Sequence, residues 1–121
     1  MRTDSVRMLE FAQHGDERGH LVVVEGMKDI PFEIKRVFYI YVVRGCHANR
    51  RSEFVLINVA GQSKVRVRDG AGNEAVFSIN RPHTGLYLPR MVWKDMYDFS
   101  PDSVLLVLSN EPYDAAEYIR D

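Results

Sequence analysis

Short β-type runs separated by turn residues are the feature that most constrains how this chain folds. In residues 63–69 the cationic side chains of Lys64, Arg66 and Arg68 alternate with small or apolar ones. A period of two is typical of a strand with one face buried and the other in water. Residues 69–73, DGAGN, follow directly, and Asp-Gly next to Gly-Asn favours a tight turn. We therefore expect a β-hairpin in this part of the chain.

Further runs of the same kind cover most of the sequence. They lie at residues 20–25, 35–43, 53–59, 74–79, 85–89 and 104–108. Their spacing, roughly 8–12 residues, is that of sandwiches and barrels, and the continuously apolar run 104–108 predicts a strand buried on both faces. A helix start is expected only at residues 114–117. About eight strands in one domain over residues 1–121 predict an all-β jelly roll. Periodicity alone leaves a sandwich of another topology open.

The composition restricts the class of protein. The chain has 121 residues, 45% of them hydrophobic and 27% charged, with a net charge of −1. This is the makeup of a globular domain and lacks the basic surface of a nucleic-acid-binding protein. No run reaches the roughly 20 apolar residues that cross a bilayer, and no signal peptide is expected. The one cysteine, Cys46, suits a packing role in a reducing compartment. We expect a cytoplasmic protein with no nucleic-acid or membrane partner.

Residues 45–49, GCHAN, form the first candidate site. His47 follows the longest aromatic run, and an extended backbone would bring it to the same side as Asn49 and Arg51. An imidazole that exchanges protons near pH 7, beside an amide and a guanidinium, suits a small-molecule site. An ordinary strand fits the bare residues equally well. The other histidines, His14, His20 and His83, are expected in surface or packing positions.

A second candidate site lies at residues 91–100. Trp93, Tyr97 and Phe99 interleave there with charged side chains that include Lys94. Aromatic walls with a few placed polar groups are typical of a nucleotide or sugar pocket. The same aromatic residues would also suit a hydrophobic core, and the sequence leaves both interpretations open.

Arginines within predicted strands form a third candidate. Arg36 and Arg66 would be aimed by a sheet rather than by a loop. The planar guanidinium matches the geometry of phosphate oxygens and binds them in a bidentate manner. We therefore expect these two arginines, more than the others, to hold a diphosphate.

Several longer phrases together carry a resemblance to a known family. They are DERG at 16–19, IPFEIKRV at 30–37, RGCHA at 44–48, GLY at 85–87, DFS at 98–100, and YD at 113–114 followed by YIR at 118–120. Over residues 16–121 the chain resembles the dTDP-sugar 3,4-ketoisomerases, WxcM-like cupins that act on dTDP-4-keto-6-deoxyglucose.

The resemblance implies a fold, a reaction and roles for named residues. The fold is a cupin jelly roll of the RmlC-like type, without metal or cofactor and usually a homodimer, that holds the dTDP-sugar inside the barrel. The ketone moves from C4 to C3 through an enediol, which requires groups that exchange protons near the working pH. His47 matches the first histidine of the family's His-Ala-His motif and would transfer the proton, while Asn49 and Tyr39 would orient or polarise the sugar. The implied substrate-binding residues are Arg18, Arg36, Arg66, Lys94, Trp93 and Tyr97. Arg18 followed by glycine is similar to the version of the family whose product has the galacto configuration at C4.

Three positions depart from the family's pattern. Asn49 replaces the second histidine of the motif, Phe38 stands where the first of two tyrosines is common, and Lys94 stands where a histidine is usual. An amide cannot carry a proton at neutral pH. It also seldom binds iron, manganese or zinc, so we expect no metal at this site.

These departures leave two other functions open beside the isomerase. A cupin that binds the nucleotide-sugar for a partner enzyme without turnover would accommodate Asn49. A 3,5-epimerase-like enzyme would share the architecture. Independently, the apolar residues 21–24 have the character of an exposed sheet edge, which favours pairing with a second chain. The sequence therefore predicts a homodimer.

Overall fold

The structure is a computed structural model that describes residues 6–41, 45–49, 52–114 and 118–120, with the backbone alone for 45–49 and 118–120. Within these residues the chain forms twelve strands and no helix. The strands are β1 (Arg7–Glu10), β2 (Gln13–Asp16), β3 (Gly19–Val22), β4 (Arg36–Ile40), β5 (Gly45–Asn49), β6 (Phe54–Ala60), β7 (Ser63–Arg68), β8 (Glu74–Ile79), β9 (Thr84–Leu88), β10 (Trp93–Tyr97), β11 (Val104–Ser109) and β12 (Tyr118–Arg120).

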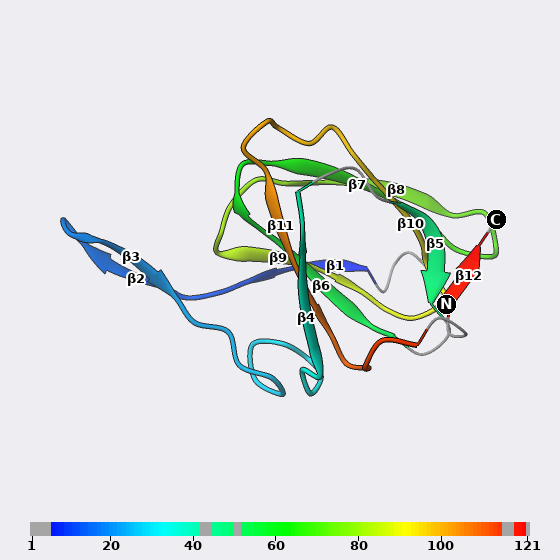
Figure 1. Ribbon diagram of the computed structural model, residues 1–121, viewed down its shortest axis with the longest axis horizontal. Coiled ribbons are helices and arrows are strands. Elements are labelled where there is room, and N and C mark those ends of the chain that lie inside the picture. Colours follow the sequence, from blue (N-terminus) through cyan, green and yellow to red (C-terminus); the bar gives the residue numbers. More distant parts are fainter. Residues whose placement is uncertain (1–5, 42–44, 50–51, 115–117, 121) are drawn as a thin grey trace.

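Two antiparallel sheets of five strands make up the body of the molecule (Figure 1). The first has the order β1-β9-β6-β11-β4, and the second has the order β12-β5-β10-β7-β8. The remaining strands, β2 and β3, pair with each other in a hairpin that projects to one side of the body. Strands far apart in the sequence, such as β6 and β11, are neighbours. This arrangement is the predicted jelly roll, and the predicted all-β fold class is confirmed.

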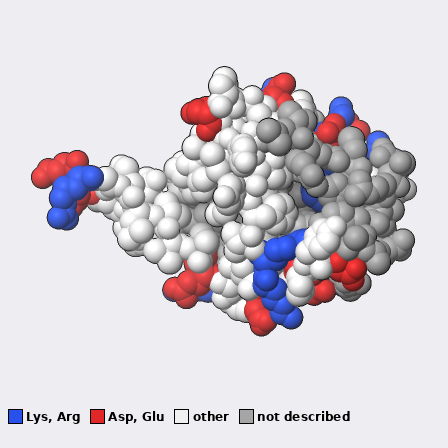
Figure 2. Space-filling model, in the orientation of Figure 1, with Lys and Arg blue, Asp and Glu red and all other residues white. Residues whose placement is uncertain are grey.

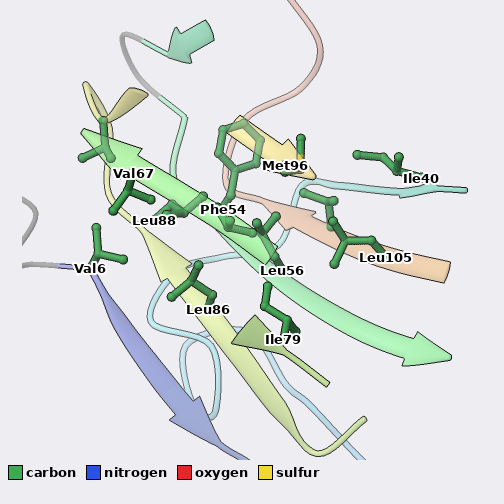
Figure 3. Packing of buried hydrophobic residues seen from close by; sticks show 13 residues of the cluster. Val6, Ile40, Phe54, Leu56, Val67, Ile79, Leu86, Leu88, Met96 and Leu105 are labelled. Carbon is green, nitrogen blue, oxygen red and sulfur yellow. The ribbon is translucent and has the colours of Figure 1, made fainter. Parts of the chain in front are cut away.

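Apolar side chains from both sheets fill the space between them (Figure 3). The first sheet contributes Phe54 and Leu56 of β6 and Leu105 of β11, and the second contributes Val67 of β7 and Met96 of β10. None of these five side chains is more than 3% exposed. Buried and exposed positions alternate along β7 as predicted, because only one face of that strand lines the core.

A second apolar layer covers the outer face of the first sheet. Val55 and Ile57 of β6 pack there with Phe11, Ile30 and Phe32, which come from the connections before β2 and after β3. β6 is therefore buried on both of its faces. The apolar run of β11 contributes to both layers in the same way, which confirms the prediction for residues 104–108.

The structure contains more strands than the sequence predicted. β1 and β2 were not predicted, because their sequences, RMLE and QHGD, show neither a continuous apolar run nor a clear alternation. The strand expected at 20–25 begins one residue earlier and ends at Val22. The helix expected at 114–117 falls mainly on residues outside the described part of the chain.

A polar cluster joins the start of β6 to β9 and to the segment after β11. Tyr87 donates a hydrogen bond to Glu53, and Asn110 Nδ2 donates one to Glu53 Oε2 at 3.1 Å. The Arg7 guanidinium carbon lies 4.7 Å from the centroid of the Tyr87 ring. Burial of the phenol and its hydrogen bond to Glu53 raise the pKa of Tyr87 to about 12.

The raised pKa predicts a loss of stability in alkaline solution. An unperturbed tyrosine ionises near pH 10, so the unfolded chain releases this proton first. The contribution to the free energy of unfolding is then fully present below pH 10 and is lost as the pH rises towards 12. We expect the absorbance difference between the wild-type protein and Tyr87→Phe to show a phenolate titrating with a midpoint of about 12. A midpoint near 10 in the folded protein would contradict the buried hydrogen bond.

Candidate active site

The interior of the barrel holds two cationic side chains beside one aromatic ring. The ring is that of Phe54, which is 3% exposed. Lys94 Nζ lies 4.4 Å from the centroid of this ring, and the guanidinium carbon of Arg36 lies 6.0 Å from it. The negative face of an aromatic ring attracts cations in this range. Positive charge is thereby held within a core built from apolar side chains.

Lys94 reaches the interior because β10 alternates between its two faces. Lys94 and Met96 are 6% and 3% exposed, whereas the residues between and beside them are half-buried. Among the described residues, the other buried ionisable side chain is Asp69. Its carboxylate accepts hydrogen bonds from the backbone of Ala71 and Asn73, so the hairpin turn accounts for it. Burying an ammonium group is costly, and Lys94 lies in a strand that lines the apolar core.

Arg36 enters the interior from the first position of β4. Its guanidinium carbon lies 5.2 Å from the centroid of the Phe38 ring and 5.8 Å from that of Tyr113. The Nε and Nη2 atoms are buried. Aromatic rings therefore hold the guanidinium, the group best suited to bind a phosphate or another planar anion.

Strand β5 pairs with β10, and His47 lies opposite Lys94 in this pair. The Cα atoms of His47 and Lys94 are register partners in this antiparallel pair, and the register shifts immediately after Lys94. On the other side of β5, strand β12 places Arg120 opposite His47 and Tyr118 opposite Asn49. Directly opposite Cα atoms in such pairs are about 4.5–5.5 Å apart. Residues 45–49 are extended, which is the condition that the interpretation of this segment as a site required, and the sheet brings them next to the buried lysine.

The two aromatic residues in β4 lie on opposite faces of the first sheet. Phe38 faces the core with its ring edge-on to that of Phe54, the centroids 6.4 Å apart. Tyr39 is 64% exposed and stacks on Tyr41 with centroids 6.3 Å apart. Consecutive strand residues point to opposite faces, so only one of the pair can enter the interior. The position of Tyr39 differs from the expectation that its hydroxyl orients a sugar inside this barrel.

Three predicted binding residues, Arg66, Trp93 and Tyr97, lie on the outer face of the second sheet. Arg66 Nη2 is 2.7 Å from Asp95 Oδ2, and its guanidinium carbon is 5.8 Å from the centroid of the Tyr97 ring. Arg68 lies in the same way over Trp93, at 6.0 Å. These pairs join β7 to β10 on the solvent side. The sheet separates them from the cations of the interior, because neighbouring residues of β10 alternate between its faces.

Arg18 lies in the turn between β2 and β3, and Figure 1 shows that this hairpin projects away from both sheets. Its Nη2 donates a hydrogen bond of 2.7 Å to Asp16 Oδ2, and the Arg18 side chain is 86% exposed. The hydrogen bonds from Arg18 lower the pKa of Asp16. Figure 2 shows this charged tip separated from the charges of the body by uncharged surface. Within one chain, Arg18 therefore does not meet the cations of the interior.

Two further groups of predictions concern histidines and metals. His14 and His20 are exposed in the hairpin, and His83 is half-buried before β9. In the part of the chain that the structure describes, no group of three or more His, Cys, Asp or Glu side chains is placed to hold a metal ion. Nor does any described segment form a helix long and apolar enough to span a membrane.

Phe54 is the residue of the site that the sequence did not reveal. The apolar run that begins at Phe54 predicted a strand, but it gave no sign of which residue would meet a cation from β10. That contact depends on how the two sheets face each other. The one available signal was the alternation of Phe54 with Leu56, which places both side chains on one face of β6.

Comparisons with known proteins identify the family of this fold. The family described as "FdtA: WxcM-like, C-terminal" matches residues 4–121. The TDP-4-oxo-6-deoxy-alpha-D-glucose-3,4-oxoisomerase of Aneurinibacillus thermoaerophilus is 40% identical over 119 residues, which cover 94% of this chain and 85% of the relative.

Solved structures agree with this result. A 3,4-ketoisomerase from Helicobacter canadensis superposes with a TM-score of 0.91 at 40% identity, covering 96% of this chain and 90% of the other. A histidine-to-asparagine variant of the 3,4-ketoisomerase QdtA from Thermoanaerobacterium thermosaccharolyticum, in complex with TDP-4-keto-6-deoxyglucose, superposes with a TM-score of 0.90 at 40% identity, covering 96% and 87%. On the combined evidence of fold, motifs and similarity along almost the whole chain, this protein belongs to the FdtA family of WxcM-like cupins.

Proposed function

We propose that this protein is a sugar-nucleotide 3,4-ketoisomerase that moves the ketone of TDP-4-keto-6-deoxyglucose from C4 to C3. The observation that carries the proposal is the 40% identity, over 94% of this chain, to a TDP-4-oxo-6-deoxyglucose 3,4-oxoisomerase. The cationic interior supports it, because a nucleotide-linked sugar brings a diphosphate and a carbonyl oxygen that both favour positive charge. No metal or cofactor enters the proposed reaction.

In the proposed reaction His47 acts as the base. It removes the proton from C3 of the sugar, which gives an enediol between C3 and C4, and a proton is then returned at C4. An imidazole suits this role because its ordinary pKa lies near neutrality. Asn49 donates a hydrogen bond to an oxygen of the enediol, since an amide can donate although it cannot ionise. Arg36 binds the diphosphate from its position among the aromatic rings of the interior.

Incubation of the protein with TDP-4-keto-6-deoxyglucose in D₂O tests the reaction directly. NMR should show a 3-keto product with deuterium at C4. The C4 hydrogen of the product comes from the group that took the C3 proton, and it is deuterium in every turnover in which that group exchanges with solvent before it returns the proton. If neither a 3-keto product nor deuterium at C3 or C4 appears with protein that binds the substrate, the isomerase proposal fails.

A second candidate function is binding of the nucleotide-sugar without turnover. Asn49 favours it, because the family's pattern has a second histidine at that position. The similar QdtA structure is likewise a histidine-to-asparagine variant in complex with TDP-4-keto-6-deoxyglucose. Calorimetry would then show binding of the TDP-sugar by the wild-type protein without product, and Asn49→His would produce no turnover either.

We also propose that the protein is a homodimer in which the hairpin packs on the second copy. A two-stranded hairpin alone is marginally stable in water, and its side of the molecule exposes Leu21 and Val23 at 60% and 48%. The outer face of β4 exposes Val37 and Tyr39 at 56% and 64%, and Tyr41, directly after the strand, is 70% exposed. A second chain would cover apolar surface at both places, and the hairpin would carry Arg18 to the partner.

Light scattering should give the mass of two chains for the wild-type protein. Leu21→Lys, which places a charge on the proposed contact, should shift the mass towards that of one chain. Val76→Lys is the matched control, because Val76 is 53% exposed on the outer side of the second sheet and should leave the dimer intact. A wild-type protein with the mass of a single chain at all concentrations would contradict the dimer.

A further inference from the structure

The proposed isomerisation requires a second proton carrier, which the motif at positions 47–49 does not supply. Moving a ketone between adjacent carbons transfers one proton between C3 and C4 and another between the oxygens on those carbons. His47 accounts for the carbon-bound proton in the proposed function. Asn49 cannot account for the oxygen-bound one, because an amide neither gains nor loses a proton at neutral pH.

The described residues of the interior leave few alternatives. Arg36 is fixed there among aromatic rings, but a guanidinium stays protonated in proteins and cannot act as a base. Phe38 faces the core with no hydroxyl group to offer, and the hydroxyl of Tyr39 lies on the outer face of the sheet. Lys94 remains, with its side chain 6% exposed and its Nζ atom 4.4 Å from the centroid of the Phe54 ring.

Two features of the sheet favour a chemical role for this lysine. Its Cα is the register partner of that of His47, so the two residues belong to one level of the β5–β10 pair. The register also shifts between Lys94 and the next residue, and such bulges re-aim side chains next to functional sites. A buried amine with a flexible four-carbon stem is the form in which lysine takes part in acid–base chemistry.

We propose that Lys94 is the catalytic residue that carries the proton between the two sugar oxygens, an inference that rests on the proposed isomerase function. In the first step His47 takes the proton from C3, the C–H electron pair becomes the C3=C4 bond, and the carbonyl oxygen on C4 takes a proton from the Lys94 ammonium. In the second step the Lys94 amine takes the proton of the hydroxyl on C3, whose oxygen becomes the new carbonyl. The electron pair of the C3=C4 bond then takes the proton from His47 at C4. Both residues return to their starting protonation states, and no oxidant or reductant is consumed.

Lys94→Arg separates this role from a purely electrostatic one. The arginine keeps a positive charge that stabilises an enediolate, but it cannot give up a proton. We expect isomerisation to fall by about 10²–10⁴-fold, the usual contribution of a positioned acid–base group. Exchange of the C3 proton with D₂O through His47 should persist, so that the substrate becomes deuterated at C3 while its ketone remains at C4. The ratio of exchange to isomerisation should therefore rise at least about 10²-fold over the wild-type ratio.

Lys94→Gln provides a second variant if arginine is not accommodated. It removes the positive charge together with the proton carrier, so isomerisation should fall at least as far as in Lys94→Arg, and exchange should fall with it. Calorimetry with TDP and a thermal melt establish that each variant binds nucleotide and folds. Lys64→Arg is the matched control on neighbouring β7, since the Lys64 side chain is 47% exposed beside Asp98, and it should leave both rates unchanged.

The possible outcomes distinguish failure of the proposed role of Lys94 from failure of the proposed isomerase function. Isomerisation by Lys94→Arg at the wild-type rate would overturn the role of Lys94 and leave the isomerase function standing. Loss of exchange and isomerisation in equal proportion by a folded, TDP-binding Lys94→Arg variant would do the same, as would isomerisation at the wild-type rate by Lys94→Gln. A wild-type protein that binds the substrate and shows neither reaction would overturn the isomerase function, and the role of Lys94 with it.

Discussion

Replacing His47 by glutamine is expected to lower the kcat for conversion of TDP-4-keto-6-deoxyglucose by about 10²–10⁴-fold, the range that a positioned general base contributes. Glutamine keeps a similar size and hydrogen-bonding groups but does not ionise at neutral pH. The C3 proton then has no acceptor, so deuterium exchange at C3 should fall together with isomerisation. Calorimetry should still show TDP binding, because the proposed contacts of the diphosphate come from another strand.

The joint loss of both reactions distinguishes His47 from Lys94, whose replacement by arginine should separate them. His83→Gln is a suitable control, because this half-buried histidine lies in the connection before β9 and is outside the proposed site. A His47→Gln variant that exchanges the C3 proton at the wild-type rate would show that another group is the base.

Phe54→Ala should cause the largest loss of stability among the substitutions considered. Phe54 is 3% exposed in the centre of the core (Figure 3), and truncation of a buried phenylalanine to alanine costs about 3–5 kcal/mol. The substitution removes the edge-on contact with Phe38 and leaves Lys94 and Arg36 without the ring that they share. Urea unfolding followed by fluorescence measures the loss as a lower midpoint with an unchanged slope.

Phe54→Leu is a control that separates the loss of packing volume from the loss of the aromatic ring that contacts the two cations. Leucine fills most of the volume, so it should destabilise the protein less than alanine, but it offers no aromatic face to the two cations. A drop in TDP affinity in Phe54→Leu at nearly full stability would indicate that the ring positions the cations. A Phe54→Ala variant destabilised by less than about 1 kcal/mol would contradict the central place of this side chain in the core.

The strands with a regular sequence pattern were predicted from the sequence, and those without one were not. Residues 63–69 alternate because one face of β7 contacts apolar side chains and the other contacts water. This alternation is visible in the sequence of the strand itself. Residues 104–108 are apolar throughout because β11 is covered on both faces. β1 and β2 are extended because they pair with β9 and β3. Each has only four residues of mixed polarity, and such a short sequence does not indicate which strand it will pair with.

For the candidate site, the sequence by itself identified the segment around His47 and the residues in which this chain departs from the family's pattern, above all Asn49. It also showed that charged and aromatic residues occur together in 91–100, but it could not tell which of them face the interior and which face solvent. The tertiary structure decided that Lys94 faces the interior while Trp93 and Tyr97 lie on the outer face. The register of β5 with β10 decided that His47 lies opposite Lys94. The physical reason is that alternation within a strand is a local property, whereas the face that is buried and the register of the partner depend on strands far away in the sequence.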